Sequence, residues 1–369
     1  MTTEHPAEGA RVIRPVEAGG SPAARPPEAA ASPAARPAEA ADRSPASRPA
    51  EADAPPVRVG RIDFVNCFPL YHHFERELAA RGVEATVVSG FPSDLNRMLV
   101  EGAIDVALPS SIAFARDAEE LVLLPQVSIS SFGAVDSIQL FSRVASHEVT
   151  RVALTEKSAT SVCLLRILCR EWGIAPEFVA WEGTFAEVLA ACDGMLLIGD
   201  DALRALRAGV FPYHLDLGEA WHDATGLHMV YAVCAARRDF VAARPAAAAA
   251  VGASLLASRD DCAARPQATA AAAAQLYDFS ASFLERYFDR LKFGFAPEYR
   301  AGLREFYRRA VEIGELDGAP DLEAVAGHAA ADPADALDPA DAPDPADAPD
   351  RDGMPRPSAP GPVHEGGAA

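Results

Sequence analysis

The two ends of this 369-residue chain lack the residues that build a hydrophobic core. Residues 1–56 contain no Phe, Trp or Tyr and repeat an Ala/Pro-rich decamer, and the residues near the C-terminus repeat an Asp-Pro-Ala hexamer. Neither segment has apolar side chains large enough to offset the entropy cost of ordering the chain. We therefore expect disordered tails over 1–56 and 328–369, with a folded part over 57–327.

Long apolar runs are also missing, as is an excess of basic residues. No stretch of 18 or more apolar residues is present, and the N-terminus has no basic segment followed by an apolar one. Membrane spans and secretory signals need those features, so we expect a cytoplasmic protein with no membrane partner. The formal net charge of −20 argues against binding nucleic acid. A small anion remains compatible with it, because backbone N–H groups at a helix start carry no formal charge.

Motifs for metals, cofactors and disulfides are absent as well. The six Cys residues form no CxxC pair and show no disulfide-like spacing, which predicts buried free thiols. The chain has no GxGxxG after a strand, no P-loop, no HExxH and no GxSxG. The sequence therefore predicts neither a metal nor a cofactor.

What the folded part does contain is an alternation of strand-like and helix-like segments. VRVGRI at 57–62 begins the pattern, and RVALT at 151–155 begins it a second time. This predicts two α/β lobes with parallel sheets and helices on both faces. We assign 57–140 and 230–327 to a discontinuous lobe 1 and 141–229 to lobe 2. Ligands of such folds bind at strand ends and helix starts between the lobes.

The stretch FVNCFPLYHH follows the first strand and holds several reactive residue types. In a helix that begins near Pro69, His72 and His73 point about 100° apart, so they do not form a metal-binding i, i+4 pair. Cys67 has no catalytic-cysteine signature around it, which predicts a small buried residue. Asn66 is either a helix cap or a ligand contact, and its spacing favours the cap.

Two further segments place hydroxyl groups at the starts of predicted helices. Ser110 and Ser111 follow a strand, and either a capping role or the binding of a carboxylate or phosphate fits them equally. Ser158, Thr160 and Ser161 follow another strand. One hydroxyl is enough for a cap, so three favour an anion-binding helix start.

Polar residues also follow two apolar runs. Gly199 ends an apolar strand and permits close backbone approach to a ligand, while Asp200 and Asp201 suit the cap of the next helix. Asp136 and Ser137 interrupt a long apolar stretch, which marks either an exposed face or a ligand site. Residue chemistry alone thus predicts a two-lobe α/β protein suited to a small carboxylate ligand.

Six segments, in this order and spacing, resemble the chorismate dehydratase family of the futalosine route to menaquinone: GRIDFVNCFPLY, ALPSSIAFAR, SISSFGAVDSIQLFSR, ALTEKSATSVCLLRILC, LLIGDDALR and DLGEAWHDATGLHMVYAVCAAR. The resemblance covers 57–310. It implies a two-lobe periplasmic-binding-protein-like (type II) fold with a ligand cleft between the lobes. It also implies a cytoplasmic lyase that converts chorismate to 3-[(1-carboxyvinyl)oxy]benzoate and water without a cofactor.

The same resemblance assigns the site. It gives catalytic roles to Asn66 in VNCFPL and Ser137 in GAVDSI, as hydrogen-bond donors to the leaving hydroxyl or a carboxylate. No His or Glu of the matching segments is an evident base, so we expect the substrate's own enolpyruvyl carboxylate to take the proton. The substrate is expected to bind through polar groups at strand ends and helix starts, namely Ser110, Ser111, Ser158, Thr160, Ser161, Gly199 and Asp200.

Two alternatives share this fold. The first is a non-catalytic small-carboxylate-binding protein, although a transport-linked version should carry a signal peptide or a lipid-attachment Cys. The second is the related 1,4-dihydroxy-6-naphthoate synthase, although the matching segments show no cleft His to act as its base.

Overall fold

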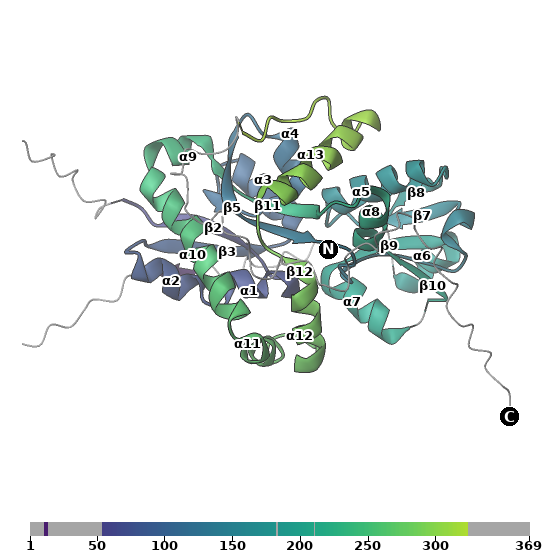
Figure 1. The fold of residues 1–369 in the computed structure, drawn as a ribbon, viewed down its shortest axis with the longest axis horizontal. Helices are drawn as coiled ribbons and strands as arrows, with labels where there is room; N and C mark the ends of the chain where they lie inside the picture. The colour runs from purple at the N-terminus through teal and green to yellow at the C-terminus, as the bar shows by residue number, and fades with distance from the viewer. Residues whose placement is uncertain (1–10, 14–53, 182–183, 210, 324–369) are drawn as a thin grey trace, which may run out of the picture. The chain divides into compact units, whose positions relative to one another are not determined.

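Two β-sheets with helices packed around them make up the computed structural model (Figure 1), which describes residues 11–13, 54–181, 184–209 and 211–323. The predicted tail over 328–369, and most of the tail over 1–56, lie outside the described residues. Arg11–Ile13, however, form strand β1, which pairs antiparallel with β3 (Ala85–Gly90). These three residues lie within the segment expected to be disordered, and the open edge of a sheet can pair with an extended segment.

The first sheet has the strand order β1-β3-β2-β4-β11-β5-β12. Strand β2 runs parallel to β3 and β4, whereas β11 runs antiparallel to β4 and β5, and β12 antiparallel to β5. The remaining bounds are β2 (Val57–Ile62), β4 (Val106–Ala107), β5 (Leu121–Ser131), β11 (Met229–Arg237) and β12 (Leu291–Lys292).

The second sheet has the order β10-β6-β9-β7-β8. Strand β7 runs parallel to β8 and β9, and β6 runs antiparallel to β9 and β10. The bounds are β6 (Ile138–Ser142), β7 (Arg151–Leu154), β8 (Glu177–Ala180), β9 (Gly194–Ile198) and β10 (Tyr213–Asp216).

Both sheets are therefore mixed, whereas the alternating pattern predicts parallel ones. The difference arises where the chain crosses between the sheets. The chain leaves the first sheet along β5 and returns along β11, so these neighbouring strands run in opposite directions. Only strands joined through a packed helix must run parallel. The sheets are consistent with two lobes, and the exact lobe boundaries stay a prediction.

Helices surround both sheets. No helix among the described residues is both long and apolar enough to cross a membrane. Around the first sheet lie the short 3₁₀ helix η2 (Val65–Cys67), α1 (Phe68–Tyr71), α2 (Phe74–Ala80), α3 (Pro92–Val100), α4 (Ser111–Arg116), α9 (Arg238–Ala243), α10 (Pro245–Ala263), α11 (Pro266–Ala273), α12 (Ala281–Arg290) and α13 (Pro297–Glu312). Around the second lie η3 (Ser146–Glu148), α5 (Ala159–Glu171), α6 (Phe185–Ala191), α7 (Gly199–Ala208) and α8 (Leu217–Thr225).

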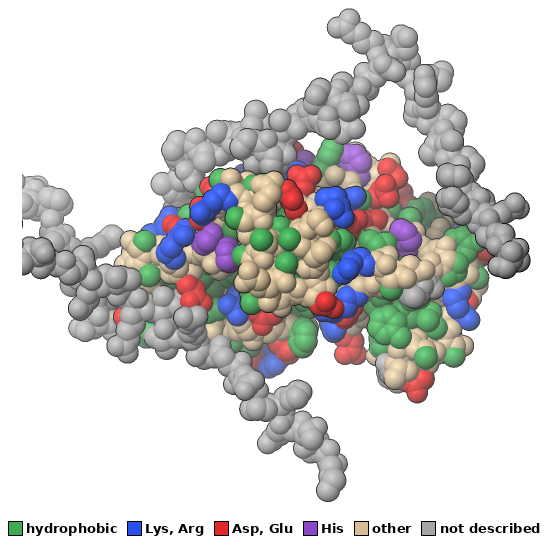
Figure 2. Space-filling model, turned by 90° about the horizontal axis from the view of Figure 1, so that it is seen from below, with side chains coloured by type: hydrophobic (Ala, Val, Ile, Leu, Met, Phe, Trp, Pro, Cys, Tyr) green, Lys and Arg blue, Asp and Glu red, His purple; other side chains and the backbone are tan. Residues whose placement is uncertain are grey.

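The core follows from strand alternation. Successive side chains of β9 point to opposite faces, so Leu196 and Ile198 join the main core while Met195 and Leu197 join a smaller cluster on the other face. The main core includes buried residues from both sheets. On the surface, Figure 2 shows Lys and Arg side chains lying among Asp and Glu side chains on the face drawn.

Candidate active site

The two crossings between the sheets lie side by side. Phe132 belongs to the first crossing, between β5 and β6, and His228 to the second, between α8 and β11. Their rings lie 4.6 Å apart, and His228 also packs against Tyr299 at 4.3 Å. The Trp221 indole donates a hydrogen bond to the carbonyl oxygen of His228 over 3.1 Å. The two segments that connect the sheets therefore pack against each other at Phe132 and His228.

Ser137 stands at the end of the first crossing, where the backbone turns sharply. It is 2% exposed, and its carbonyl oxygen accepts a 2.7 Å hydrogen bond from Gly199. The preceding residue, Asp136, has a φ of 59° and is the one non-glycine residue with a positive φ among those described. Asp136 also pairs with Arg290 of α12 over 3.1 Å. A left-handed residue is unfavourable by itself, so other contacts must hold this turn.

Asp216 supplies those contacts. Its carboxylate is 6% exposed and accepts backbone hydrogen bonds from Val135 (3.1 Å) and Asp136 (2.6 Å), and one from the Gln139 amide (2.6 Å). It also accepts the N–H groups of the first turn of α8, as the helix cap. Burial raises the pKa of Asp216, and the backbone donors oppose that rise. One carboxylate therefore joins the start of α8 to the turn that precedes Ser137.

Asn66 lies across the junction, within η2. It forms no cap, because neither η2 nor α1 has a side-chain hydrogen bond at its start. The spacing-based preference for a cap is therefore wrong. The Asn66 amide oxygen is buried and has no hydrogen-bond partner among the described residues. An unsatisfied buried acceptor costs about 1–3 kcal/mol, so this group is prepared to bind a donor from outside the protein.

Asp200 and Gly199 connect η2 to the second sheet. The Asp200 carboxylate accepts the backbone N–H of Val65 over 3.1 Å, which caps η2 from the opposite half of the molecule. Burial raises the pKa of Asp200. Gly199 has a φ of +57°, and a Cβ there would lie 3.1 Å from the Phe64 ring. Both the backbone conformation and the close approach require glycine. These contacts bring Asn66, Ser137 and Asp200 to the same junction.

Two hydroxyl-rich helix starts, those of α4 and α5, meet across the two halves. Thr160 of α5 accepts the N–H of Ile112 in α4 over 3.0 Å, a contact between the two halves. Ser158 caps α5 by accepting the N–H of Ser161 (3.2 Å), and their hydroxyls share a 2.9 Å hydrogen bond.

Ser111 and Ser110 differ in how their hydroxyls are used. The Ser111 hydroxyl donates to the carbonyl oxygen of Val230 over 2.6 Å. The Ser110 hydroxyl is buried without a partner among the described residues. Of the five helix-start hydroxyl groups that were predicted to bind substrate, four have hydrogen-bond partners within the protein. Ser110 is the one whose hydroxyl is free among the described residues.

Sequence reasoning missed Tyr287 on α12. Its side chain is 1% exposed, and its hydroxyl has no partner with hydrogen-bond geometry among the described residues. The Ser137 side chain lies within loose hydrogen-bonding range of the phenol and opposes the rise in the pKa of Tyr287, although the pair does not meet full hydrogen-bond distance and angle. The available signal was a tyrosine on the buried face of an amphipathic helix, which is the same signal that a core residue gives.

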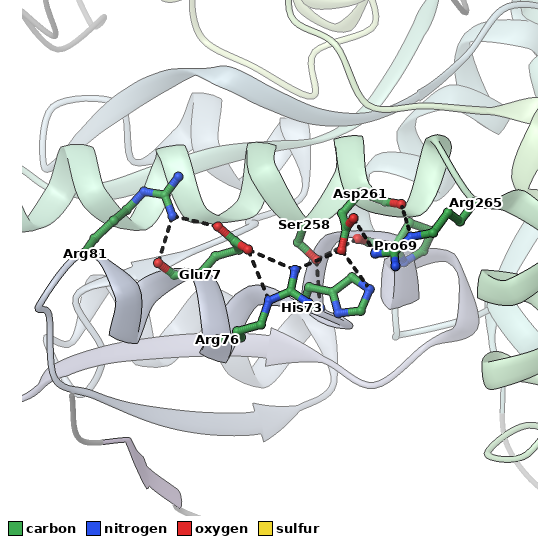
Figure 3. Close-up of polar contacts among 8 residues, drawn as sticks. All are labelled: Pro69, His73, Arg76, Glu77, Arg81, Ser258, Asp261 and Arg265. Atoms are coloured by element: carbon green, nitrogen blue, oxygen red, sulfur yellow. Dashed lines mark hydrogen bonds and ion pairs between the residues drawn. The ribbon is translucent and has the colours of Figure 1, made fainter. Parts of the chain in front are cut away.

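The Cys and the His pair of the opening stretch have other surroundings. Cys67 is buried, and burial together with the nearby Asp200 carboxylate raises the pKa of its thiol, which disfavours a nucleophilic thiolate. Figure 3 shows His73 and Arg76 pointing at Asp261 of α10, at 3.2 and 2.8 Å. Among the described residues, no group of three or more His, Cys, Asp or Glu side chains could hold a metal ion.

Helix α10 also sets the direction of the helix that follows Asn66. The Ser258 hydroxyl donates to the Pro69 carbonyl oxygen and accepts from the His73 N–H, both over 3.0 Å (Figure 3). Those two backbone groups would bond to each other in a continuous helix. The inserted hydroxyl therefore explains why α1 and α2 are separate helices.

A cavity of about 310 Å³ lies elsewhere, beside β7, β8 and α6. It contains none of the predicted site residues. Its lining consists of Arg151, Ala153, Val179, Ala180, Glu187, Val188, Ala191 and Cys192.

Residues 57–312 match a protein family described as "Menaquinone biosynthesis". Among curated proteins, the chain is similar to a chorismate dehydratase of Thermus thermophilus, with 38% identity over 199 residues that cover 50% of this chain and 71% of that protein. It is also similar to a chorismate dehydratase of Campylobacter jejuni, with 29% identity over 175 residues that cover 47% and 64% of the two chains.

Solved structures confirm the fold expected from the resemblance. The alkanesulfonate-binding protein of Xanthomonas axonopodis, bound to MOPS, superposes with a TM-score of 0.56 at 16% identity and covers 73% of this chain and 97% of that one. The periplasmic aliphatic sulphonate binding protein of Escherichia coli gives a TM-score of 0.54 at 14% identity, covering 73% and 91%. Likeness at this identity shows a periplasmic-binding-protein-like fold and nothing about the ligand.

Proposed function

This chain belongs to the chorismate dehydratase family of menaquinone biosynthesis, and from that membership we propose that it is a carbon–oxygen lyase. It removes water from chorismate and gives 3-[(1-carboxyvinyl)oxy]benzoate, in the cytoplasm. The observation that carries the proposal is the buried, unpartnered Asn66 amide oxygen at the junction that also holds Ser137.

The substrate explains what the site must do. The ring proton on the carbon that bears the enolpyruvyl ether is vinylogous to the ring carboxylate. Its removal gives an anion delocalised into that carboxylate, and loss of the neighbouring hydroxyl then makes an aromatic ring. Aromatisation drives the reaction, and the elimination involves no net oxidation or reduction. The protein must therefore hold two carboxylates, stabilise spreading negative charge and assist the departing hydroxyl.

Asn66 and Ser137 fit these tasks. An amide offers both a donor and an acceptor, so Asn66 can accept from the substrate hydroxyl and donate to a neighbouring oxygen. Ser137 donates to a carboxylate on the ring. The free hydroxyl of Ser110 and the starts of α5 and α7 add further donors at positions where a helix dipole favours negative charge.

Asp200 requires a separate explanation, because chorismate is a dianion. A charged carboxylate beside the substrate would repel it, and burial, which raises the pKa of Asp200, acts against that charge. Its hydrogen bond to Val65 links the two halves of the site. The proton acceptor is then the enolpyruvyl carboxylate of the substrate, which the site holds near the ring.

Substrate entry requires the two halves to separate. Such a movement would have to break contacts that cross between the halves. Val65 with Asp200 and Ile112 with Thr160 lie at the site. Ion pairs such as Arg166 with Glu315 cross elsewhere. We infer a hinge at the two crossings, with lobe 1 over 57–140 and 230–327 and lobe 2 over 141–229. Closure then excludes water and completes the donor set.

The test is to incubate the purified full-length protein with chorismate and to follow formation of the carboxyvinyloxy-benzoate by mass spectrometry. Turnover supports the lyase. Binding of chorismate by calorimetry without product would favour the non-catalytic carboxylate-binding protein; the solved structures of similar fold include proteins that bind sulfonates. Absence of both binding and turnover would contradict both assignments.

A further inference from the structure

We propose that Tyr287 is a third catalytic residue, whose phenol hydrogen-bonds to the departing hydroxyl of the substrate and gives it the proton with which it leaves as water. This inference rests on the proposed dehydratase function. It concerns a residue on α12, outside the six segments that carry the family resemblance.

The hydroxyl of Tyr287 has one polar neighbour among the described residues, the Ser137 side chain, which is itself a predicted catalytic group. The ring is buried against Phe283 and Phe288, with centroids 6.3 and 5.9 Å away, so the ring serves the core. The hydroxyl is buried and lacks a partner of hydrogen-bond distance and angle. A buried hydroxyl without a good partner costs about 1–3 kcal/mol. A phenylalanine at this position would pack equally well and would avoid that cost.

Other buried tyrosines of the described chain use their hydroxyls. Tyr71 donates to the Gly60 carbonyl oxygen over 2.9 Å, and Tyr307 donates to the Ser111 carbonyl oxygen over 2.8 Å. Tyr231 shares a 2.9 Å hydrogen bond with the Ser131 hydroxyl. Tyr287 departs from that pattern, which indicates that its partner comes from outside the protein.

The position of Tyr287 points to the same junction. Its phenol is influenced by the Ser137 side chain and by the charges of Asp200 and Asp136. Arg290, three residues further along α12 and so on the same side of the helix, pairs with Asp136 in the turn before Ser137. Helix α12 is thereby fixed to the first crossing, and Tyr287 is fixed with it.

The phenol is in the protonated form that a donor needs. Burial raises the pKa of Tyr287 well above its ordinary value, and the nearby Asp200 and Cys67 raise it further, while Ser137 partly opposes the rise. At neutral pH the group is therefore a neutral O–H. A neutral phenol can give its proton to the departing oxygen as negative charge develops there, so that the group leaves as water instead of the strong base hydroxide.

The proton balance closes within the site. The enolpyruvyl carboxylate takes the ring proton, and the electron pair of that C–H bond completes the aromatic ring as the C–O bond breaks. The C–O electron pair goes to the departing oxygen, which takes the phenol proton and leaves as water. The new carboxylic acid then returns its proton to the tyrosinate. No oxidant or further reactant is needed.

Tyr287→Phe is the matched test, because it removes one oxygen and keeps the ring. We expect kcat with chorismate to fall by about 100-fold or more, with KM within about threefold, because a general acid contributes about 10²–10⁴. The thermal unfolding temperature should change little, since the one polar neighbour of the hydroxyl, Ser137, does not meet full hydrogen-bond distance and angle. Tyr307→Phe is the control and should show the reverse: lower thermal stability from the lost bond to Ser111, with kcat within about threefold.

The outcomes separate this inference from the proposed function. If the wild-type protein makes no product, the dehydratase assignment fails and the role of Tyr287 falls with it. If the wild type turns over and Tyr287→Phe keeps its kcat, or raises KM alone, the inference is wrong while the function stands. A clear loss of folding in Tyr287→Phe would show a structural partner for the hydroxyl and would also overturn it.

Discussion

At the scale of single residues, Asn66 and Ser137 differ from ordinary cap and surface residues in their burial and in their hydrogen bonds. Asn66 follows a strand and precedes a helix, a position where capping is common, yet its amide oxygen is buried and unpartnered. Ser137 interrupts an apolar run, a pattern that exposed strand residues also produce, yet it is 2% exposed. Local spacing alone cannot distinguish these cases, because the deciding contacts come from residues distant in sequence.

Ser137→Ala and Asn66→Ala are expected to lower kcat by about 100-fold or more each, as removal of a single transition-state donor does. Thermal stability should change little for Asn66→Ala, because the amide oxygen has no partner to lose. Steady-state kinetics with chorismate and thermal unfolding of each variant are the measurements.

Ser142→Ala is the control for Ser137, since Ser142 is equally buried at the other end of β6 and donates to the Val144 carbonyl oxygen over 2.6 Å. It should lose about 1 kcal/mol of stability and keep its kcat. Turnover near wild type in both Ser137→Ala and Asn66→Ala would refute their catalytic assignment.

At the scale of elements, the turn before β6 depends on the start of α8. Asp216 is the N-cap of α8, and nothing in its local sequence indicates a role in the site. The structure adds the turn donors Val135 and Asp136, which lie 81 and 80 positions away along the chain. A residue that holds both elements acts on Ser137 by positioning it, without touching the substrate.

Asp216→Asn should lower kcat by about tenfold or more, because an amide NH₂ would face the turn's N–H donors and displace Ser137. The free energy of unfolding should fall by at least about 2 kcal/mol, since hydrogen bonds to a charged group are lost. The double variant with Ser137→Ala should have the same kcat as Ser137→Ala alone, if Asp216 acts through Ser137.

Asp193→Asn provides the element-scale control. Asp193 accepts from the Thr150 N–H (2.9 Å), the Thr150 hydroxyl (2.6 Å) and the Arg151 N–H (3.1 Å), away from the junction. Its substitution should lower stability without changing kcat. Equal effects of the two substitutions on kcat would mean that Asp216 has a general structural role only.

At the scale of the whole molecule, the two crossings form the connection on which lobe movement depends. His228 packs between Phe132 and Tyr299, and a Cβ on Gly302 of α13 would lie 2.0 Å from the His228 carbonyl oxygen. Glycine therefore lets α13 pack directly on the second crossing. Burial, with Lys292 and His222 nearby, lowers the pKa of His228 from 6.5 to about 4.

The folded protein should consequently lose stability as the pH falls from about 6.5 to about 4. The unfolded chain takes up a proton at His228 in that range and the folded chain does not, so acid favours unfolding. His228→Phe keeps an aromatic ring and should flatten this part of the stability–pH curve, as measured by urea unfolding at a series of pH values. An unchanged curve for His228→Phe would contradict the prediction.

The sequence by itself determined the α/β class, the buried character of its cysteines and the family, because periodic apolar patterns and ordered motifs are local properties of the chain. It could not give the mixed strand directions, since these depend on how the chain crosses between the sheets. Only the tertiary structure identified Tyr287 and Asp216 and removed the capping role of Asn66. Those assignments follow from whether a buried polar atom has a partner, and the partners lie on elements far apart in the sequence.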